Sequence, residues 1–215
     1  MQIDIYSDTI CPWCYIGKRR LARALEERPQ SDLEIRWRAF QLNPEMPEEG
    51  MERQRYLEVK FGGPDNARQV YDRVREAGRS EAIPFAFEAI QRTPNTIASH
   101  RLISFATSRG VADPVVDGLF EAYFLEGRDI GDDQILTEVA VAAGLEADEV
   151  RAFLNSDVEV QAVRAEDARA RQIGIQGVPT FILNNKYVLS GAHPPEVLFQ
   201  LFDLAKQDDA DRQAS

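Results

Sequence analysis

The 215-residue sequence is poor in cysteine and histidine, with two of each, and it lacks any apolar run near the ~20 residues that span a bilayer. Without such a run, no membrane partner is expected. Two cysteines are too few for a disulfide scaffold, so stability must come from a packed core. Basic residues number 25 against 36 acidic ones. The net charge of −11 argues against a nucleic-acid partner, because such a protein needs a basic surface to neutralise phosphates.

The composition is otherwise that of an ordinary globular protein. Hydrophobic residues make up 44% and charged residues 28%, which excludes gross disorder and fibrous repeats. The first residues show neither the basic nor the apolar segment of a secretory signal, so we expect a cytoplasmic protein.

Alternating apolar residues predict strands at both ends of the chain. Residues 2–6 and 33–38 alternate, and a helical pattern lies between them, which is typical of two parallel strands joined by a right-handed crossover. Near the other end, residues 180–183 and 187–189 predict a hairpin whose turn is Asn184-Asn185. An amphipathic helix follows.

The middle of the chain has a helical period. Residues 43–50 are rich in Pro and Glu and indicate a linker, whereas residues 83–90 are apolar without a clean period and stay unassigned. Helices are predicted at 64–78, 98–110, 115–123, 135–143, 147–154 and 157–173. The predicted organisation is α/β, with one unit formed by residues 1–46 and 165–206, an all-helical insertion at 47–164 and a frayed polar tail at 207–215.

Both cysteines lie in one motif, Cys11-Pro12-Trp13-Cys14, directly after the first strand. Pro12 fits the first position of a helix. Disulfide exchange requires a thiolate, and the unpaired N–H groups at a helix N-terminus favour one. We therefore predict that Cys11 is the nucleophile, more exposed and more acidic than Cys14, and that Cys14 is the resolving thiol one turn later.

Two other interpretations of the cysteine pair exist. Structural cysteines fall this close together by chance in a minority of chains. The motif is also half of a zinc site, whose remaining ligands would be His100 and His193. These two histidines lie in different segments without the spacing of zinc ligands, so no metal is predicted.

The sequence resembles the DsbA-like branch of the thioredoxin superfamily, and within it the FrnE-type proteins known as polyketide-biosynthesis dithiol–disulfide isomerases. The resemblance covers nearly the whole chain. It rests on four stretches: Asp8 to Cys14 followed by Gly17, Pro94 to Leu102, Gly174 to Phe181, and Ser190-Gly191-Ala192. It implies a thioredoxin fold with a large all-helical insertion and a thiol–disulfide oxidoreductase activity. No cofactor is required, and the partners are thiols or disulfides of a protein, a peptide or glutathione, with glutathione as a redox partner.

The resemblance also implies a set of substrate-binding residues around the cysteines. Val178-Pro179 would be a cis dipeptide beside them, its backbone free to pair with a bound peptide; the rival is a trans proline that starts a strand. The segment with Asn95 and His100 would lie in the insertion facing the cleft. Asn95 also suits a helix cap and His100 a structural role. The predicted substrate-contacting set is Pro12, Trp13, Asn95, His100, Val178, Pro179 and His193.

Two alternative functions stay open. The 2-hydroxychromene-2-carboxylate isomerases and the kappa-class glutathione transferases share this architecture, but they carry a serine where this chain has Cys11, and they use it to activate glutathione. A non-enzymatic binding module is the second alternative. Two cysteines favour dithiol redox chemistry over glutathione conjugation.

Overall fold

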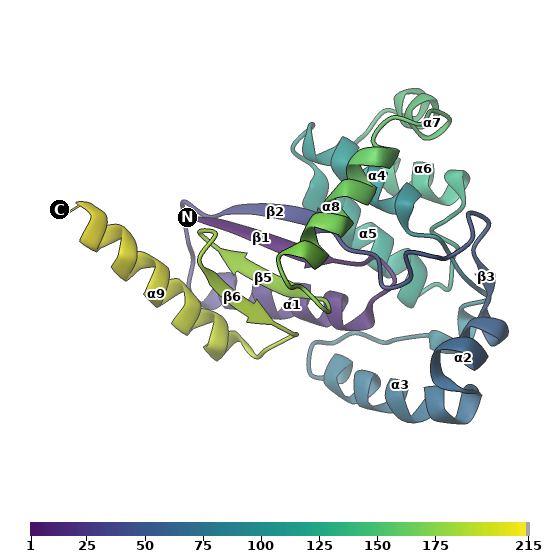
Figure 1. Cartoon of the computed structure of the whole chain (residues 1–215), viewed down its shortest axis with the longest axis horizontal. Helices are drawn as coiled ribbons and strands as arrows, with labels where there is room; N and C mark the ends of the chain where they lie inside the picture. The colour runs from purple at the N-terminus through teal and green to yellow at the C-terminus, as the bar shows by residue number, and fades with distance from the viewer. Residues whose placement is uncertain (214–215) are drawn as a thin grey trace.

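The fold is built on a four-stranded mixed sheet (Figure 1). The computed structural model describes residues 1–213. Strand β1 (Gln2–Ser7) runs parallel to β2 (Glu34–Ala39) and antiparallel to β5 (Thr180–Leu183), which pairs with β6 (Tyr187–Ser190). The strand–helix–strand unit and the hairpin predicted at the two ends of the chain are confirmed.

The two faces of this sheet are covered by different helices. Helix α1 (Pro12–Glu27) and helix α9 (Pro195–Gln213) pack on the face to which Ile3, Ile5 and Phe181 point. Tyr6 and Ile182 belong to the opposite face, where they meet α8 (Val160–Gln172). Each strand alternates its side chains between these two layers, so both faces of the central strand β1 are buried.

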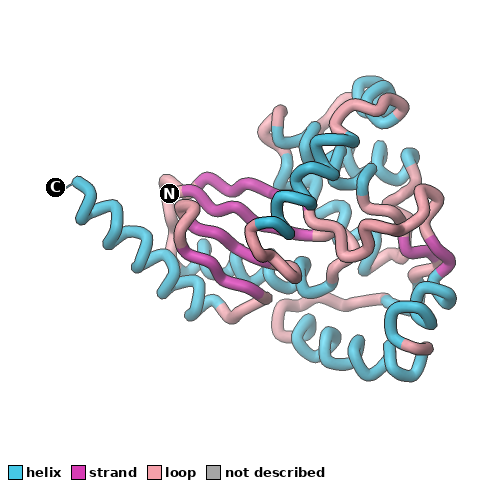
Figure 2. Tube along the Cα trace, viewed as in Figure 1, coloured by secondary structure: helices cyan, strands magenta, loops and turns pink. Residues whose placement is uncertain are grey.

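The segment between β2 and β5 forms a second, mainly helical layer beside the sheet (Figure 2). Its core is aromatic and reaches into α1, because Tyr15 stacks on Phe120 with ring centroids 5.1 Å apart. Besides α8, its elements are β3 (Met51–Glu52), α2 (Arg53–Phe61), α3 (Pro64–Arg79), the short 3-10 helix η1 (Phe87–Ala89), β4 (Arg92–Thr93), α4 (Ile97–Thr107), α5 (Ala112–Phe124), α6 (Asp133–Ala142) and α7 (Ala147–Leu154). The fold is a thioredoxin fold with a helical insertion, as predicted.

The insertion is not wholly helical, so that detail of the prediction is wrong. Strands β3 and β4 pair antiparallel, with Met51 opposite Thr93. Helix α2 was also not predicted from the sequence. It begins where the Glu52 side chain accepts hydrogen bonds from two backbone N–H groups and ends at Gly62, whose φ of 75° is left-handed. Val59 on this helix is 62% exposed, so the apolar residues of α2 do not all lie on one buried face. The sequence of α2 therefore has no clear helical period of apolar residues.

Two predicted boundaries differ from the structure. The division at residues 164 and 165 falls inside α8, which packs against both α4 and the sheet. The end of the chain, expected to fray from residue 207, is helical to Gln213, and Lys186 on the β5–β6 turn forms an ion pair with Asp208. Residues 214–215 of the predicted tail lie outside the described residues. Within the described part, no helix has the length and apolarity needed to cross a bilayer.

Candidate active site

The two cysteines lie where β1 ends and α1 begins. Cys11 is the N-cap residue of α1, with extended φ and ψ of −94° and 111°, and no side chain caps the first turn. A tight turn precedes it, because the Cys11 N–H donates to the Asp8 carbonyl at 3.0 Å. The Cys11 sulfur therefore lies at the N-terminus of α1, where the backbone N–H groups of the first turn have no partner within the helix.

Both thiols are free and buried. Cys11 is 4% exposed and Cys14 is 2% exposed, so Cys11 is the more accessible of the two by only a small margin. Burial raises the pKa of the Cys14 thiol, and a hydrogen bond with Cys11 raises that pKa further. The sequence predicted that Cys11 is more exposed than Cys14, and the two values have this order. Both thiols are nevertheless buried, and the loop before β5 covers Cys11 through the Val178 carbonyl.

This loop carries the dipeptide Val178-Pro179, and its peptide bond is cis, as predicted. The Cys11 thiol donates to the Val178 carbonyl oxygen with a sulfur–oxygen distance of 3.5 Å. The proline ring packs on α1 at Gly17, where an added Cβ would lie only 2.9 Å from Pro179 Cγ. Glycine at this position thus allows the loop to approach the cysteines.

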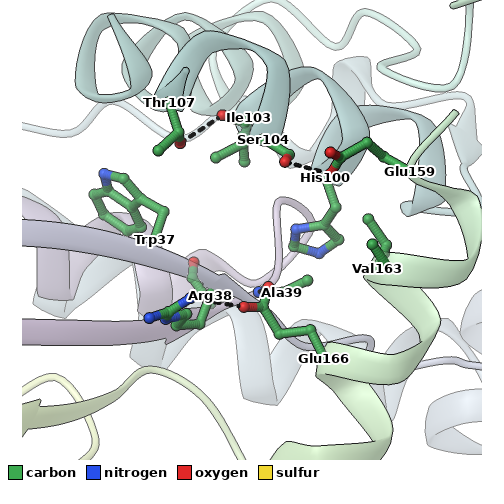
Figure 3. A pocket seen from close by; sticks show the side chains of 12 residues that line it. Trp37, Arg38, Ala39, His100, Ile103, Ser104, Thr107, Glu159, Val163 and Glu166 are labelled. Carbon is green, nitrogen blue, oxygen red and sulfur yellow. Dashed lines mark hydrogen bonds and ion pairs between the residues drawn. The ribbon is translucent and has the colours of Figure 1, made fainter. Parts of the chain in front are cut away.

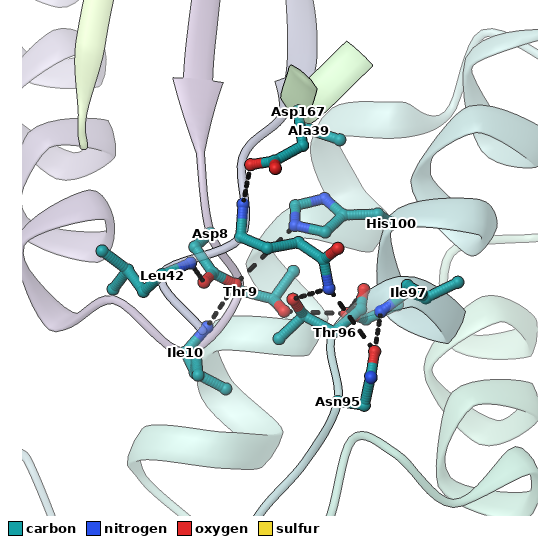
Figure 4. Close-up of polar contacts among 12 residues, drawn as sticks. Asp8, Thr9, Ile10, Ala39, Leu42, Asn95, Thr96, Ile97, His100 and Asp167 are labelled. Atoms are coloured by element: carbon teal, nitrogen blue, oxygen red, sulfur yellow. Dashed lines mark hydrogen bonds and ion pairs between the residues drawn. The ribbon is translucent and has the colours of Figure 1, made fainter. Parts of the chain in front are cut away.

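A buried carboxylate lies behind the cysteine turn. Asp8 is fully buried, and its carboxylate accepts hydrogen bonds from the Leu42 N–H at 2.7 Å and the Ile10 N–H at 3.5 Å. His100 Nε2 lies 3.7 Å from Asp8 Oδ1 (Figure 4). Sequence reasoning did not single out Asp8, although an acidic residue three positions before the first cysteine, at the end of an apolar strand, was the available signal.

His100 projects from α4 between β2 and α8 (Figure 3). Its side chain is buried, and its Nε2 has no hydrogen-bond partner among the described residues. It borders a cavity of about 170 Å³ that Ser7 also lines. His100 thus lies behind the cysteine turn, beside Asp8. The resemblance had implied that its segment faces the cleft.

The remaining predicted residues have varied positions. Asn95 Oδ1 accepts from the Ile97 N–H at 3.0 Å, and its amide donates to the Met46 carbonyl at 2.7 Å, so it holds the start of α4 against the loop between β2 and β3. His193 lies after β6, with Nε2 2.9 Å from the Ser190 carbonyl oxygen. Pro12 and Trp13 are partly exposed at the start of α1. The structure thus brings Val178 and Pro179 to the start of α1 beside the cysteines. It brings His100 to Asp8, in the turn before Cys11.

Fold and site together define a class: thioredoxin-fold proteins with two cysteines at the N-terminus of the first helix, a cis-proline loop against them and a helical insertion. The family model of the DSBA-like thioredoxin domain matches residues 2–203. The chain belongs to this family.

Comparisons with individual proteins agree. The Bacillus subtilis protein YwbO is 26% identical over 201 residues, which cover 92% of this chain and 93% of YwbO. The structure of a probable DsbA oxidoreductase from Streptomyces coelicolor superposes with a TM-score of 0.86 at 34% identity, covering 96% of this chain and 90% of the other. A 2-hydroxychromene-2-carboxylate isomerase has a TM-score of 0.71 at 18% identity, with all of both chains covered. The isomerase therefore shares the fold.

Proposed function

We propose that this protein is a thiol–disulfide oxidoreductase of the FrnE type, with Cys11 as its nucleophile and Cys14 as its resolving thiol. One observation carries the proposal: Cys11 caps the N-terminus of α1 while its sulfur contacts the Val178 carbonyl of the cis-proline loop. This arrangement places the proposed nucleophile at a helix N-terminus and next to a backbone that can hold a substrate chain.

The exchange proceeds in two displacements. The Cys11 thiolate attacks one sulfur of a substrate disulfide, the substrate S–S bond breaks, and one substrate thiolate leaves. A mixed disulfide now joins Cys11 to the other half of the substrate. Cys14 then loses its proton and attacks the Cys11 sulfur, which releases the second substrate thiolate and forms the Cys11–Cys14 disulfide. Two electrons pass from the protein to the substrate, and the oxidised protein runs the same steps in reverse.

The substrates we propose are thiols and disulfides of peptides, proteins or glutathione in the cytoplasm. A cysteine-containing chain would lie along the Val178 backbone, with Pro12, Trp13 and His193 at the edges of the contact. Proline at position 179 offers no N–H, so it presents no donor that competes for the sulfurs. Asn95 and His100 act behind this surface, through the loop and the turn that they support.

The sharpest alternative is a glutathione-dependent isomerase or transferase, and the two cysteines separate the hypotheses. Conjugation or isomerisation needs one residue that activates the glutathione thiol, so Cys14 would be dispensable. A dithiol enzyme needs both cysteines. A binding module without activity would need neither.

The equilibrium reduction potential of the Cys11–Cys14 pair in glutathione buffers tests the proposal. A dithiol enzyme will show a cooperative two-electron transition within the range of thioredoxin-like proteins, about −270 to −120 mV. Cys11→Ser will abolish turnover of a model disulfide, and Cys14→Ser will trap the mixed disulfide. Full turnover by Cys14→Ser would overturn the proposal in favour of the glutathione-dependent alternative, and an inert Cys11 would favour the binding module.

A further inference from the structure

The loop between β6 and α9, here called the β6–α9 loop, lies beside the cis-proline loop (Figure 1). Its Ala192 packs against the same core cluster as Val178, and this cluster contains Cys11. The N–H of the neighbouring Gly191 donates to the Pro179 carbonyl oxygen at 2.8 Å. The place of the cis-proline loop beside the nucleophile therefore depends on where the β6–α9 loop is held.

Arg20 holds the β6–α9 loop against α1. Its Nη1 donates to the Ala192 carbonyl oxygen at 2.6 Å, and its Nε donates to Glu81 Oε1 at 2.9 Å. The two contacts use different nitrogens of one planar guanidinium, so the carboxylate sets the direction in which the group points at the loop. The Arg20 side chain is 15% exposed, so little water competes for these hydrogen bonds.

Glu81 is a fixed acceptor that the insertion supplies to α1. Its side chain is 3% exposed and forms ion pairs with Arg20 and Arg23, as a buried carboxylate requires. It lies in the turn that ends α3, where its N–H donates to the Gly78 carbonyl at 3.0 Å. The next residue, Ala82, has a left-handed φ of 55°, which is uncommon for a residue with a side chain. Such a conformation persists where the surrounding structure fixes it.

Arg23 shares this carboxylate but has a different reach. Its Nη1 donates to Glu81 Oε2 at 3.0 Å, and its side chain is 40% exposed. Its other ion pair, with Glu27, lies within α1. Of the two arginines on Glu81, Arg20 is the one that extends the contact to the β6–α9 loop.

We propose that Arg20 is a positioning residue for the binding of peptide substrates. Through Ala192 and Gly191 it holds the cis-proline loop in the place where a peptide pairs with the Val178 backbone. The inference rests on the proposed function. A loop that is already ordered binds a peptide more tightly, because its ordering does not have to be offset at the moment of binding.

A small disulfide sets the limit of this role. It makes no backbone pairing with the cis-proline loop and requires only the sulfur of Cys11. Loss of Arg20 will therefore weaken the binding of a peptide disulfide and spare the reaction with a small one. A general loss of structure would impair both.

The test compares two disulfides with the same leaving group. One is dithiobis(nitrobenzoate), and the other is a short peptide whose single cysteine is joined to nitrothiobenzoate. Cys11 attacks one sulfur, the S–S bond breaks, and coloured nitrothiobenzoate leaves, because its thiol is more acidic than that of the peptide. In stopped-flow measurements on the reduced protein, the first release against substrate concentration gives a half-saturation concentration and a maximal rate.

Arg20→Gln will raise the half-saturation concentration for the peptide by about tenfold, which corresponds to about 1.4 kcal/mol of binding. The maximal rate with the peptide and the rate with the small disulfide will stay within about twofold of native values, as expected when binding alone is lost. Arg23→Gln is the matched control and will leave both substrates at native values. Arg20→Lys keeps the charge beside Glu81 but lacks the planar fork, so it will show the same selective loss as Arg20→Gln.

Hydrogen exchange gives a readout that is independent of activity. The Gly191 amide is protected by its hydrogen bond to the Pro179 carbonyl, so its exchange in Arg20→Gln will be at least about tenfold faster. The amides of β5, which lies between β1 and β6, will keep their native exchange rates. Arg23→Gln will change neither set of amides.

Four results would overturn the inference: an unchanged half-saturation concentration for the peptide in Arg20→Gln, an equal loss with both disulfides, the same loss in Arg23→Gln, or unchanged exchange at Gly191. If Arg20→Gln does not fold, Arg20→Lys decides by the same criteria. A native protein that attacks the peptide without saturation also rejects the inference, because Arg20 would then have no peptide contact to position. Release from neither disulfide by the native protein would reject the proposed function itself.

Discussion

The hydroxyl oxygens of Thr9 and Ser99 lie 2.8 Å apart in the interior, although 90 positions separate the two residues. Ser99 Oγ donates to the Thr96 carbonyl at 3.0 Å, so Thr9 is the donor of the shared hydrogen bond. Thr9 belongs to the turn that carries Cys11, and Ser99 belongs to α4. A hydrogen bond thus joins the insertion to the turn that carries Cys11.

Ser99→Ala will destabilise the fold through this contact. The Thr9 hydroxyl would remain buried without an acceptor, which costs about 1–3 kcal/mol. Urea unfolding measures the change in the free energy of unfolding. Ser108→Ala, at an exposed position at the end of α4, is the matched control and will change it by less than about 0.5 kcal/mol. Equal values for the two variants would show that the Thr9–Ser99 bond contributes nothing.

The two cysteines will differ in reactivity when each is studied alone. In Cys14→Ser, Cys11 at the helix N-terminus will react with iodoacetamide near neutral pH. In Cys11→Ser, Cys14 will react at least about tenfold more slowly, because burial raises its pKa, and its rate will rise only in alkaline solution. Rates of alkylation against pH give the comparison. Faster labelling of Cys14 near neutral pH would reverse the assignment of nucleophile and resolving thiol.

Gly17→Ala will lower both stability and exchange rate. The added methyl would lie 2.9 Å from Pro179 Cγ and 3.2 Å from Phe181 Cζ, so the cis-proline loop must move away from α1. Overpacking of this kind costs about 1–3 kcal/mol. Gly177→Ala is the control for stability, because its methyl would meet nothing within 4 Å. A Gly17→Ala protein as stable as Gly177→Ala would indicate that the loop is not held against the helix.

The insertion will lose stability in alkaline solution through its buried tyrosines. Burial raises the pKa of Tyr56 to about 12 and also raises that of Tyr71. An unfolded tyrosine ionises near 10, so between pH 10 and pH 12 the unfolded chain releases protons that the folded chain retains. The free energy of unfolding therefore falls across this window and is unaffected by these groups below it.

Tyr56→Phe tests this dependence directly. Urea unfolding at pH 9 and pH 11 will show a fall of about 1 kcal/mol from Tyr56 in the native protein, and this part will be absent in the variant. The same slope in both proteins would mean that Tyr56 ionises equally in the folded and unfolded states.

The sequence predicted the local features of the site because each has a local signature. A cysteine pair after a strand, with Pro12 between them, marks a helix start, and the residues around Pro179 matched a known motif. The pairing of Asp8 with Leu42 and His100 was not predicted, because it joins distant parts of the chain through single contacts. Strands β3 and β4 have two residues each, too few for an alternating pattern.

Helix α8 has a mechanical consequence for how substrates enter. Near its start, Glu159 accepts from Ser104 of α4, and further along, Glu166 and Asp167 accept backbone N–H groups at the end of β2. One continuous helix is therefore hydrogen-bonded to both layers, and it leaves no hinge between them at this point. We infer that access to the Cys11 sulfur depends on displacement of the loop around Val178, whose carbonyl contacts it, rather than on a hinge movement of the insertion.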